Sequence, residues 1–183
     1  CHICSGHFYK GVTPMEMARA YMALANKGIY KEVSIIRRIE NSNGIPIYEF
    51  NQTAQQIITE ETAFIMNNIL QSTVKSGTAR KLSSLALPLA AKTGTAQLPD
   101  TKEFKGINGI KDSWVVAYNP DYVVTVWMGF DITDKKHFLP TNAVGGNQPT
   151  QIAKNIFQYI SSKVKLNNFI KPVKVKEVKF KVF

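Results

Sequence analysis

Two strand-forming runs joined by a tight turn constrain the fold of this chain most. Residues 113–130 read SWVVAYNPDYVVTVWMGF. Valine and aromatic residues dominate 113–118 and 122–130, and Asn119-Pro120-Asp121 between them consists of turn-forming residue types. A connection this short can join only antiparallel neighbours, because a parallel pair needs a crossover of a dozen or more residues. The sequence therefore predicts an antiparallel sheet.

Three stretches carry the pattern of amphipathic helices. Thr13-Pro14-Met15-Glu16 combines a capping box with proline at the first helical position, and Gly28 is placed to end this helix. Residues 60–75 predict a second helix, which Gly77 ends, and a third begins near Pro149. We expect the apolar stripe of the third helix to face the strands that hold the two tryptophans. The expected stripes are Ala63, Met66, Ile69, Leu70 and Val74 in the second helix and Ile152, Ile156, Tyr159, Ile160 and Val164 in the third.

Further strand signals complete an α+β fold. Asn43-Gly44 is a strong two-residue turn and predicts a hairpin over 33–50. Residues 85–91 are an apolar run of strand length, with Pro88 at an edge or at the strand's beginning. In the tail, 169–183, lysine alternates with valine or phenylalanine, which predicts one more strand with a wet face. We expect an antiparallel sheet of about three strands plus a hairpin, flanked by helices.

The charge balance is strongly basic. A net charge of +10 favours anionic partners such as nucleic acid, anionic lipid or an acidic wall polymer. The lysines are spread along the chain, and no aromatic-plus-basic surface motif accompanies them. Surface solubility is therefore the simpler interpretation, and we expect no nucleic-acid partner. The chain has no run of 18 apolar residues, so we expect no membrane-spanning helix within it.

The two cysteines lie close together at the start of the chain. Cys1 and Cys4 form a C-x-x-C pair beside His2 and His7, a pattern found at zinc and redox sites. A zinc site normally draws four ligands from two chain segments, and the only other histidine is His137. We therefore expect no metal and no cofactor.

Two segments of the form Lys-Ser/Thr-Gly-Thr raise the question of a catalytic signature. Lys75-Ser76-Gly77-Thr78 lies where a helix ends, and lysine followed by glycine suits a helix C-terminus without any chemistry. Lys92-Thr93-Gly94-Thr95 follows an apolar run on a predicted edge strand, where neither capping nor a tight turn explains it. A phosphate-binding P-loop would need glycine in place of Ala86 and Ala91, so that reading fails.

Four separated blocks carry a family resemblance. "GVTPMEMARAYMALANKG", "ETAFIMNNILQSTVKSGTAR", "AAKTGTAQ" and "DSWVVAYNPDYVVTVWMGFD", in this order and spacing, closely resemble the class A penicillin-binding proteins, which are bifunctional cell-wall synthases. The match is to the later half of their D,D-transpeptidase domain, over residues 8–168. Residues 1–7 depart from the pattern, which puts their native origin in question, and the tail 169–183 resembles the strand after that domain. The resemblance implies a penicillin-binding-protein or β-lactamase-like fold.

The resemblance also implies roles for the residues of the second segment. Lys92, Thr93 and Gly94 match the K-T-G triplet, one of three signatures of penicillin-recognising serine acyltransferases. Lys92 would supply positive charge beside a serine nucleophile, and the hydroxyls of Thr93 and Thr95 would hold a terminal carboxylate. Gly94 would let the ligand lie close to the strand, and the Thr95 amide would form half of the oxyanion hole.

The nucleophile motif of the family, S-x-x-K, has no convincing match, and S-x-N is absent. S-x-x-K occurs at Ser72–Lys75 and Ser162–Lys165, but both lie late in predicted helices, where the helix dipole disfavours an oxyanion-forming nucleophile. We therefore expect a fragment of a D,D-transpeptidase that carries one wall of the site and is inert alone. The alternative is a non-catalytic binding or interaction module of the same fold.

The fragment interpretation carries further expectations about partners and location. The intact protein would bind peptidoglycan stem peptides ending in D-Ala-D-Ala and β-lactams, at the extracytoplasmic face of a bacterial membrane, anchored by an upstream segment. The upstream half of the domain would be a partner of this chain. The strand at Tyr122–Phe130 would have an open edge, covered by the basic tail, by the 33–50 hairpin or by a second copy through self-association.

Overall fold

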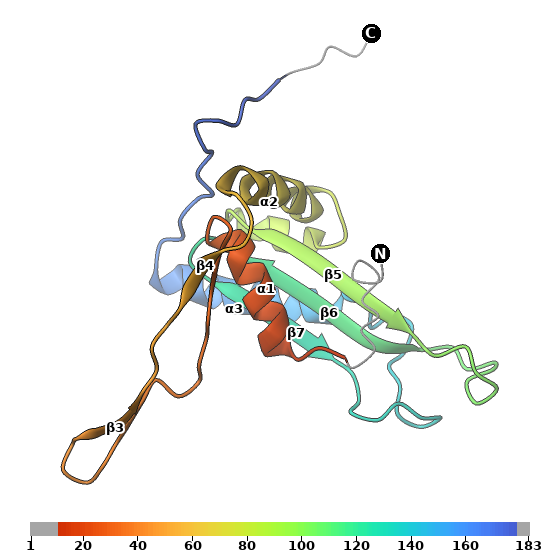
Figure 1. Cartoon of the computed structure of the whole chain (residues 1–183). Coiled ribbons are helices and arrows are strands. Elements are labelled where there is room, and N and C mark those ends of the chain that lie inside the picture. Colours follow the sequence, from red (N-terminus) through yellow and green to blue (C-terminus); the bar gives the residue numbers. More distant parts are fainter. Residues whose placement is uncertain (1–10, 179–183) are drawn as a thin grey trace.

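The computed structural model describes residues 11–178, which are built around one antiparallel sheet (Figure 1). The sheet has the strand order β5-β6-β7, formed by β5 (Ala90–Gln97), β6 (Ile110–Tyr118) and β7 (Val123–Met128). Asn119 closes the tight turn between β6 and β7: its N–H donates to the Tyr122 carbonyl at 3.0 Å, and its side-chain oxygen accepts from the Tyr122 N–H at 2.9 Å. The predicted α+β fold with an antiparallel sheet is confirmed.

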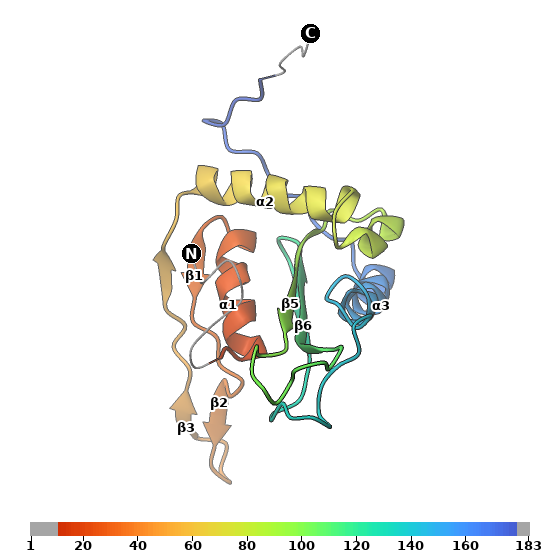
Figure 2. The same cartoon turned by 90° about the vertical axis from the view of Figure 1, so that its right-hand side faces the viewer.

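Helices cover both faces of this sheet (Figure 2). α1 (Pro14–Ala25) lies on one face, α3 (Gln148–Lys163) on the other, and α2 (Glu60–Lys75) crosses one end. Side chains of β6 alternate between the two faces, and both are buried. Val115 and Ala117 pack in a cluster with α3, whereas Val116 and Tyr118 pack in a second cluster with α1 and α2. β6 is therefore the central strand that joins the two halves of the core.

The helix starts follow the expected capping chemistry. The Glu16 N–H donates to Thr13 Oγ1 at 3.2 Å, and the Thr13 N–H donates to Glu16 Oε2 at 2.8 Å, so the predicted capping box is complete. Thr59 caps α2 by accepting from the Thr62 N–H at 3.2 Å. α1 and α2 therefore begin where their sequences predict.

Most of the expected inward stripe of α3 is wrong: of its members, only Ile160 packs against the buried cluster. Ile152, Ile156 and Tyr159 are 42%, 38% and 67% exposed, while Ala153 and Phe157 are fully buried. Two neighbouring stripes of α3, one with the isoleucines and one with Ala153 and Phe157, both follow the 3.6-residue helical period, and the isoleucine stripe is the more apolar in sequence. Small Ala153 lets the helix backbone lie close to the sheet, and the large ring of Phe157 fills the remaining space.

In α2 the buried face is also shifted from the expectation. Ala63, Leu70 and Val74 are buried as expected, but Met66 and Ile69 are 39% and 54% exposed. Asn67 takes the inner position instead. Its side chain accepts a hydrogen bond from the Tyr118 hydroxyl at 2.7 Å and donates to the Leu24 carbonyl at 2.8 Å, so this buried amide is satisfied.

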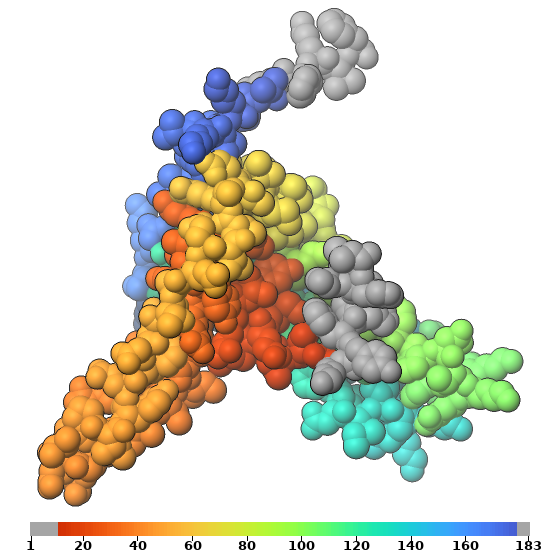
Figure 3. Space-filling view, viewed as in Figure 1, coloured from red at the N-terminus to blue at the C-terminus, as the bar shows by residue number. Residues whose placement is uncertain are grey.

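One strand expectation needs correction, and one strand pair was not predicted. Residues 85–91 are not a strand: the short 3₁₀ helix η1 (Arg80–Leu85) ends there, and β5 begins only at Ala90. The predicted hairpin is confirmed as β2 (Arg38–Glu40) and β3 (Pro46–Glu49), which project from the body (Figures 1 and 3). A second pair at its base, β1 (Ile29–Lys31) with β4 (Ala54–Gln56), was not predicted. Ala54-Gln55-Gln56 has too little strand preference to signal it.

Within residues 11–178, no strand pairs with the outer edge of β7. The hairpin strands pair with each other, and residues 169–178 form no strand, so neither of these expected covers is present there. The remainder of the predicted tail strand, 179–183, lies outside the described residues, as do Cys1, Cys4, His2 and His7. Self-association through this edge stays a prediction.

The described residues include neither a membrane-spanning helix nor a metal-binding group. In the part of the chain between Gly11 and Val178, no helix is long and apolar enough to cross a membrane. The same residues contain no group of three or more metal-binding side chains.

Candidate functional site

The Lys92–Thr95 segment lies on the outer strand of the sheet. β5 pairs on one side with β6, with Gly94 opposite Trp114 and Thr95 opposite Ser113. On its other side the end of α2 covers only the beginning of the strand, where Thr73 Oγ1 donates to the Ala91 carbonyl at 2.5 Å. Beyond that bond, no described strand pairs with this edge of β5. The predicted edge position of the segment is confirmed.

The backbone direction of β5 can be read from its acceptors. The Ala91 carbonyl accepts from Thr73 and the Thr93 carbonyl accepts from Lys92 Nζ at 2.7 Å, so both point away from β6. Backbone groups of alternate residues point the same way along a strand. The N–H of Thr95 therefore also points off the free edge, where it can meet an acceptor that lies along the strand.

Side chains of the segment alternate between the two faces, as the sequence predicts. Gly94 lies against Trp114: a β-carbon at position 94 would come within 3.3 Å of Trp114 Cβ. Trp114 in turn packs at 6.1 Å, centroid to centroid, against Trp127, whose indole N–H donates to Asp112 at 3.0 Å. A side chain at position 94 would press on this aromatic pair. Glycine there keeps the strand flat and open to close approach.

The two threonines of the segment face the opposite side, and each has a protein partner. Thr93 Oγ1 lies 2.7 Å from Thr78 Oγ1, and Thr95 Oγ1 accepts from the Gly145 N–H at 3.2 Å. Neither Thr78 nor Gly145 was predicted as a site residue. The signal for Thr78 was present, because it ends the first Lys-Ser-Gly-Thr segment. Helix capping accounts for the lysine and the glycine of that segment but not for its threonine.

The Gly145-Gly146 loop lies very close to β5. A β-carbon on Gly145 would come within 2.2 Å of the Trp114 carbonyl oxygen and 2.6 Å of the Gly94 carbonyl oxygen. Buried Thr150 fixes the loop by donating to the Gly145 carbonyl at 2.6 Å. The loop can therefore reach Thr95 only because position 145 carries no side chain.

The two S-x-x-K segments show no nucleophile geometry. Ser72 Oγ donates to the Ile69 carbonyl at 2.5 Å, and Ser162 Oγ donates to the Tyr159 carbonyl at 2.7 Å. Both are bonds to the preceding turn of the same helix. A serine nucleophile needs a base within hydrogen-bond reach of its hydroxyl. The geometry thus agrees with the prediction that neither Ser72 nor Ser162 is the nucleophile.

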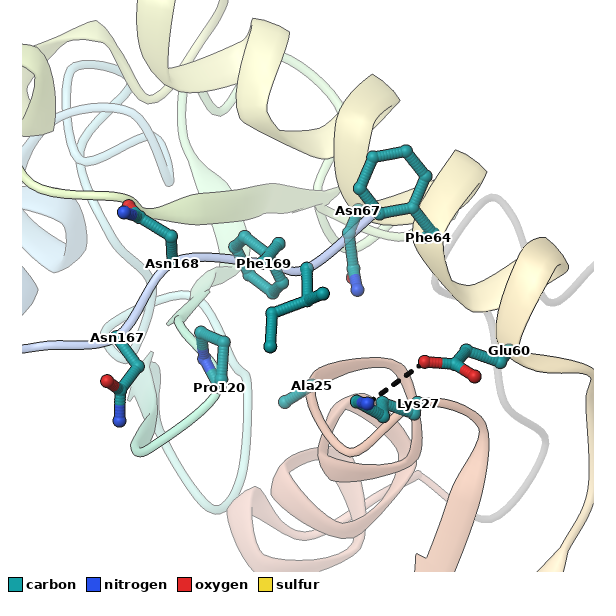
Figure 4. A pocket seen from close by; sticks show the side chains of 10 residues that line it. Ala25, Lys27, Glu60, Phe64, Asn67, Pro120, Asn167, Asn168 and Phe169 are labelled. Atoms are coloured by element: carbon teal, nitrogen blue, oxygen red, sulfur yellow. Dashed lines mark ion pairs between the residues drawn. The ribbon is translucent and has the colours of Figure 1, made fainter. Parts of the chain in front are cut away.

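A cavity of about 440 Å³ lies elsewhere, between the end of α1, the first half of α2 and the segment after α3 (Figure 4). Its walls include Phe64 and Phe169, and Lys27 and Glu60 form an ion pair of 3.0 Å at its margin. Residues 92–95 do not line this cavity. An exposed ion pair of this kind contributes little, and the segment that carries the catalytic signature lies outside the cavity, so the edge of β5 is the candidate site.

Known proteins resemble this chain along most of its length. The family described as "Penicillin binding protein transpeptidase domain" matches residues 5–158. Penicillin-binding protein 1F of Bacillus subtilis is 32% identical over 174 residues, which are 94% of this chain and 23% of that protein. The chain spans about a fifth of the length of the first curated relatives it matches.

Solved structures show the same fold. Penicillin-binding protein 1A from Haemophilus influenzae superposes with a TM-score of 0.67 at 22% identity, over 88% of this chain and 28% of that chain. Penicillin-binding protein A from Mycobacterium tuberculosis, solved as an imipenem acyl-enzyme complex, superposes with a TM-score of 0.61 at 17% identity, over 82% of this chain and 31% of that one. The fold, the family match and the level of identity agree: the chain belongs to the penicillin-binding protein transpeptidase family and is related to its class A members.

Proposed function

We propose that this chain forms the K-T-G wall of a serine D,D-transpeptidase that cross-links peptidoglycan stem peptides. The observation that carries the proposal is the Lys92–Thr95 segment on a strand edge that is free beyond Ala91, with the Thr95 N–H directed off that edge. A D-Ala-D-Ala peptide or a β-lactam lying along β5 would meet these groups in order. No cofactor takes part in this chemistry.

Each residue has a role set by its chemistry. Lys92 supplies a positive charge beside the attacking serine, and Thr93 donates its hydroxyl hydrogen to the ligand carboxylate. Gly94 permits the close approach, and the Thr95 amide donates to the oxyanion that forms when the serine attacks. The serine and its base come from the upstream half of the domain, since neither Ser72 nor Ser162 is free of its own helix. The chain alone is therefore inert.

Exposed apolar side chains support an upstream partner for this chain. Ile65, Met66 and Ile69 of α2 are 39–54% exposed, and α3 exposes Ile152 and Tyr159. Exposed large apolar side chains gathered on one helix are typical of interaction surfaces. We propose that the upstream half of the domain packs there, and that an upstream segment anchors the intact protein at the extracytoplasmic face of the membrane. The non-catalytic module remains the alternative, and an upstream S-x-x-K in the same reading frame would exclude it.

Penicillin labelling of the intact protein tests the proposal. Lys92→Ala should slow labelling by a fluorescent penicillin roughly 10- to 100-fold, because a hydrogen bond to a charged group is worth about 1.5–3 kcal/mol. Lys75→Ala, in the other Lys-Ser-Gly-Thr segment, is the matched control and should label at the normal rate. The isolated chain should show no adduct by intact-mass spectrometry. Equal labelling of both variants, or an adduct at Ser72 or Ser162, would contradict the proposal.

A further inference from the structure

A hydroxyl pair links the two Lys-Ser/Thr-Gly-Thr segments. Thr78 Oγ1 and Thr93 Oγ1 lie 2.7 Å apart, although 15 residues separate them in sequence. We propose that Thr78 is a positioning residue that holds the Thr93 hydroxyl ready to donate to the ligand carboxylate. This inference rests on the function proposed above, because it gives Thr93 that ligand.

The turn after α2 fixes the position of Thr78. The N–H groups of Gly77 and Ala79 both donate to the Thr73 carbonyl at 3.1 Å, and Ala79 is fully buried. A β-carbon on Gly77 would come within 2.6 Å of Thr73 Cα, so the turn is too tight for a side chain there. Thr73 also donates to the Ala91 carbonyl, two residues before Thr93. The end of α2 and β5 are thus tied together next to the hydroxyl pair.

The Gly145-Gly146 loop closes the other side of Thr78. A β-carbon on Gly146 would come within 2.5 Å of the Thr78 carbonyl oxygen, so the loop backbone lies directly against this residue. Lys81 donates to the Asn147 side chain and ties the same loop to η1. Thr78 therefore has backbone neighbours on both sides, and its exposed hydroxyl has Thr93 as its partner.

The number of hydroxyl hydrogens in this pair explains how Thr78 can assist binding of a carboxylate to Thr93. Each threonine hydroxyl carries one hydrogen and two acceptor lone pairs. When Thr93 donates its hydrogen to a carboxylate, the Thr93 oxygen can only accept from Thr78, so Thr78 becomes the donor of the pair. The hydrogen bonds then run from Thr78 to Thr93 and from Thr93 to the carboxylate, and each bond polarises the next. No proton moves and no covalent bond changes.

Acylation rates of the intact protein test this role. We expect Thr78→Val to lower the second-order acylation rate with benzylpenicillin roughly three- to tenfold, the effect of one neutral hydrogen bond. The rate with benzylpenicillin methyl ester, which lacks the carboxylate charge, should change less than twofold. Thr78→Ser should restore the benzylpenicillin rate. Thr62→Val is the matched control, because it removes a hydroxyl from the 3.0 Å Thr59–Thr62 pair at the other end of α2.

The outcomes separate this inference from the proposed function. In a Thr93→Val background, Thr78→Val should have no further effect on the benzylpenicillin rate. The positioning role would be overturned if Thr78→Val lowered the acylation rate equally with both ligands, lowered it with neither, or had its full effect in the Thr93→Val background. The Lys92→Ala variant tests the proposed function separately. If Thr78→Val lowers the melting temperature, Thr78→Ala in the same two-ligand comparison provides the second measurement.

Discussion

At the residue scale, one exposed carboxylate joins the β6–β7 turn to the segment that follows α3. Asp121 accepts hydrogen bonds from the Asn167 N–H at 2.7 Å, from the Asn167 side chain at 2.8 Å and from Asn119 Nδ2 at 2.9 Å. The Asn167 N–H, the largest cause, and the side-chain amides of Asn167 and Asn119 lower the pKa of Asp121 below its ordinary value of 3.8. The charged form of Asp121 therefore stabilises the folded chain.

The sign of this pKa shift predicts how the stability of the chain depends on pH. A carboxyl whose folded-state pKa is depressed contributes stability above its unfolded pKa, and this contribution is lost as pH falls through the folded value. Asp121→Asn keeps one acceptor oxygen and removes the charge. We expect it to lower the melting temperature at pH 7 and to approach the parent's melting temperature below about pH 3.8. Asp131→Asn, at another exposed aspartate, is the control. A difference in melting temperature between Asp121→Asn and the parent that stays constant with pH would contradict this account.

At the element scale, α3 shows how helix packing depends on shape as well as on apolar character. Phe157 is fully buried in the cluster with Val115 and Ala117, whereas Ile156, one residue earlier, is 38% exposed. The two side chains leave the helix about 100° apart, so one faces the sheet and the other faces outward. The aromatic ring rather than the isoleucine stripe anchors the helix.

Truncation of these two neighbours gives a direct test of the packing. Phe157→Ala should lower the free energy of unfolding by about 3–5 kcal/mol, because it opens a cavity between α3 and the sheet. Ile156→Ala should cost less than about 1 kcal/mol in the isolated chain, since its side chain is already partly in water. Urea unfolding followed by circular dichroism measures both. Equal losses would mean that the assignment of the inner face is wrong.

At the scale of the whole molecule, the chain consists of a packed body and a projecting hairpin (Figure 3). Every residue of β2 and β3 is exposed, and Ile39, Ile47 and Tyr48 are 42–67% exposed. The hairpin contributes nothing to the two buried clusters. Its local unfolding should therefore need far less free energy than global unfolding.

Limited proteolysis checks this difference between hairpin and body. Apart from cleavage at the tail lysines after residue 170, trypsin should cut after Arg37 or Arg38, in the hairpin, before it cuts after Lys154, in α3. Mass spectrometry of early time points identifies the order of cleavage. Cleavage after Lys154 that keeps pace with cleavage in the hairpin would show that the body opens as readily as the hairpin does.

The sequence by itself determined the features that depend on neighbouring residues. The capping box at Thr13 and the turn at Asn119 are local chemistry, and both are where the sequence predicts them. The hairpin over 33–50 also forms, but its loop is longer than the predicted two-residue Asn43-Gly44 turn, because the Asn41 N–H donates to the Ile45 carbonyl across it at 2.9 Å. The edge position of Lys92–Thr95 was also predicted from sequence, from Pro88 in the apolar run before it, although β5 itself begins only at Ala90.

Tertiary structure alone decided what depends on distant residues. Which stripe of α3 turns inward follows from the shape of the sheet surface, which no periodicity in the helix encodes. β1 and β4 pair beside the end of α1 and the start of α2, and three residues each are too few to show a strand alternation in the sequence. The contact of Thr78 with Thr93 likewise exists only because Thr73 ties the end of α2 to β5, and a hydrogen bond across 15 residues leaves no local pattern in the sequence.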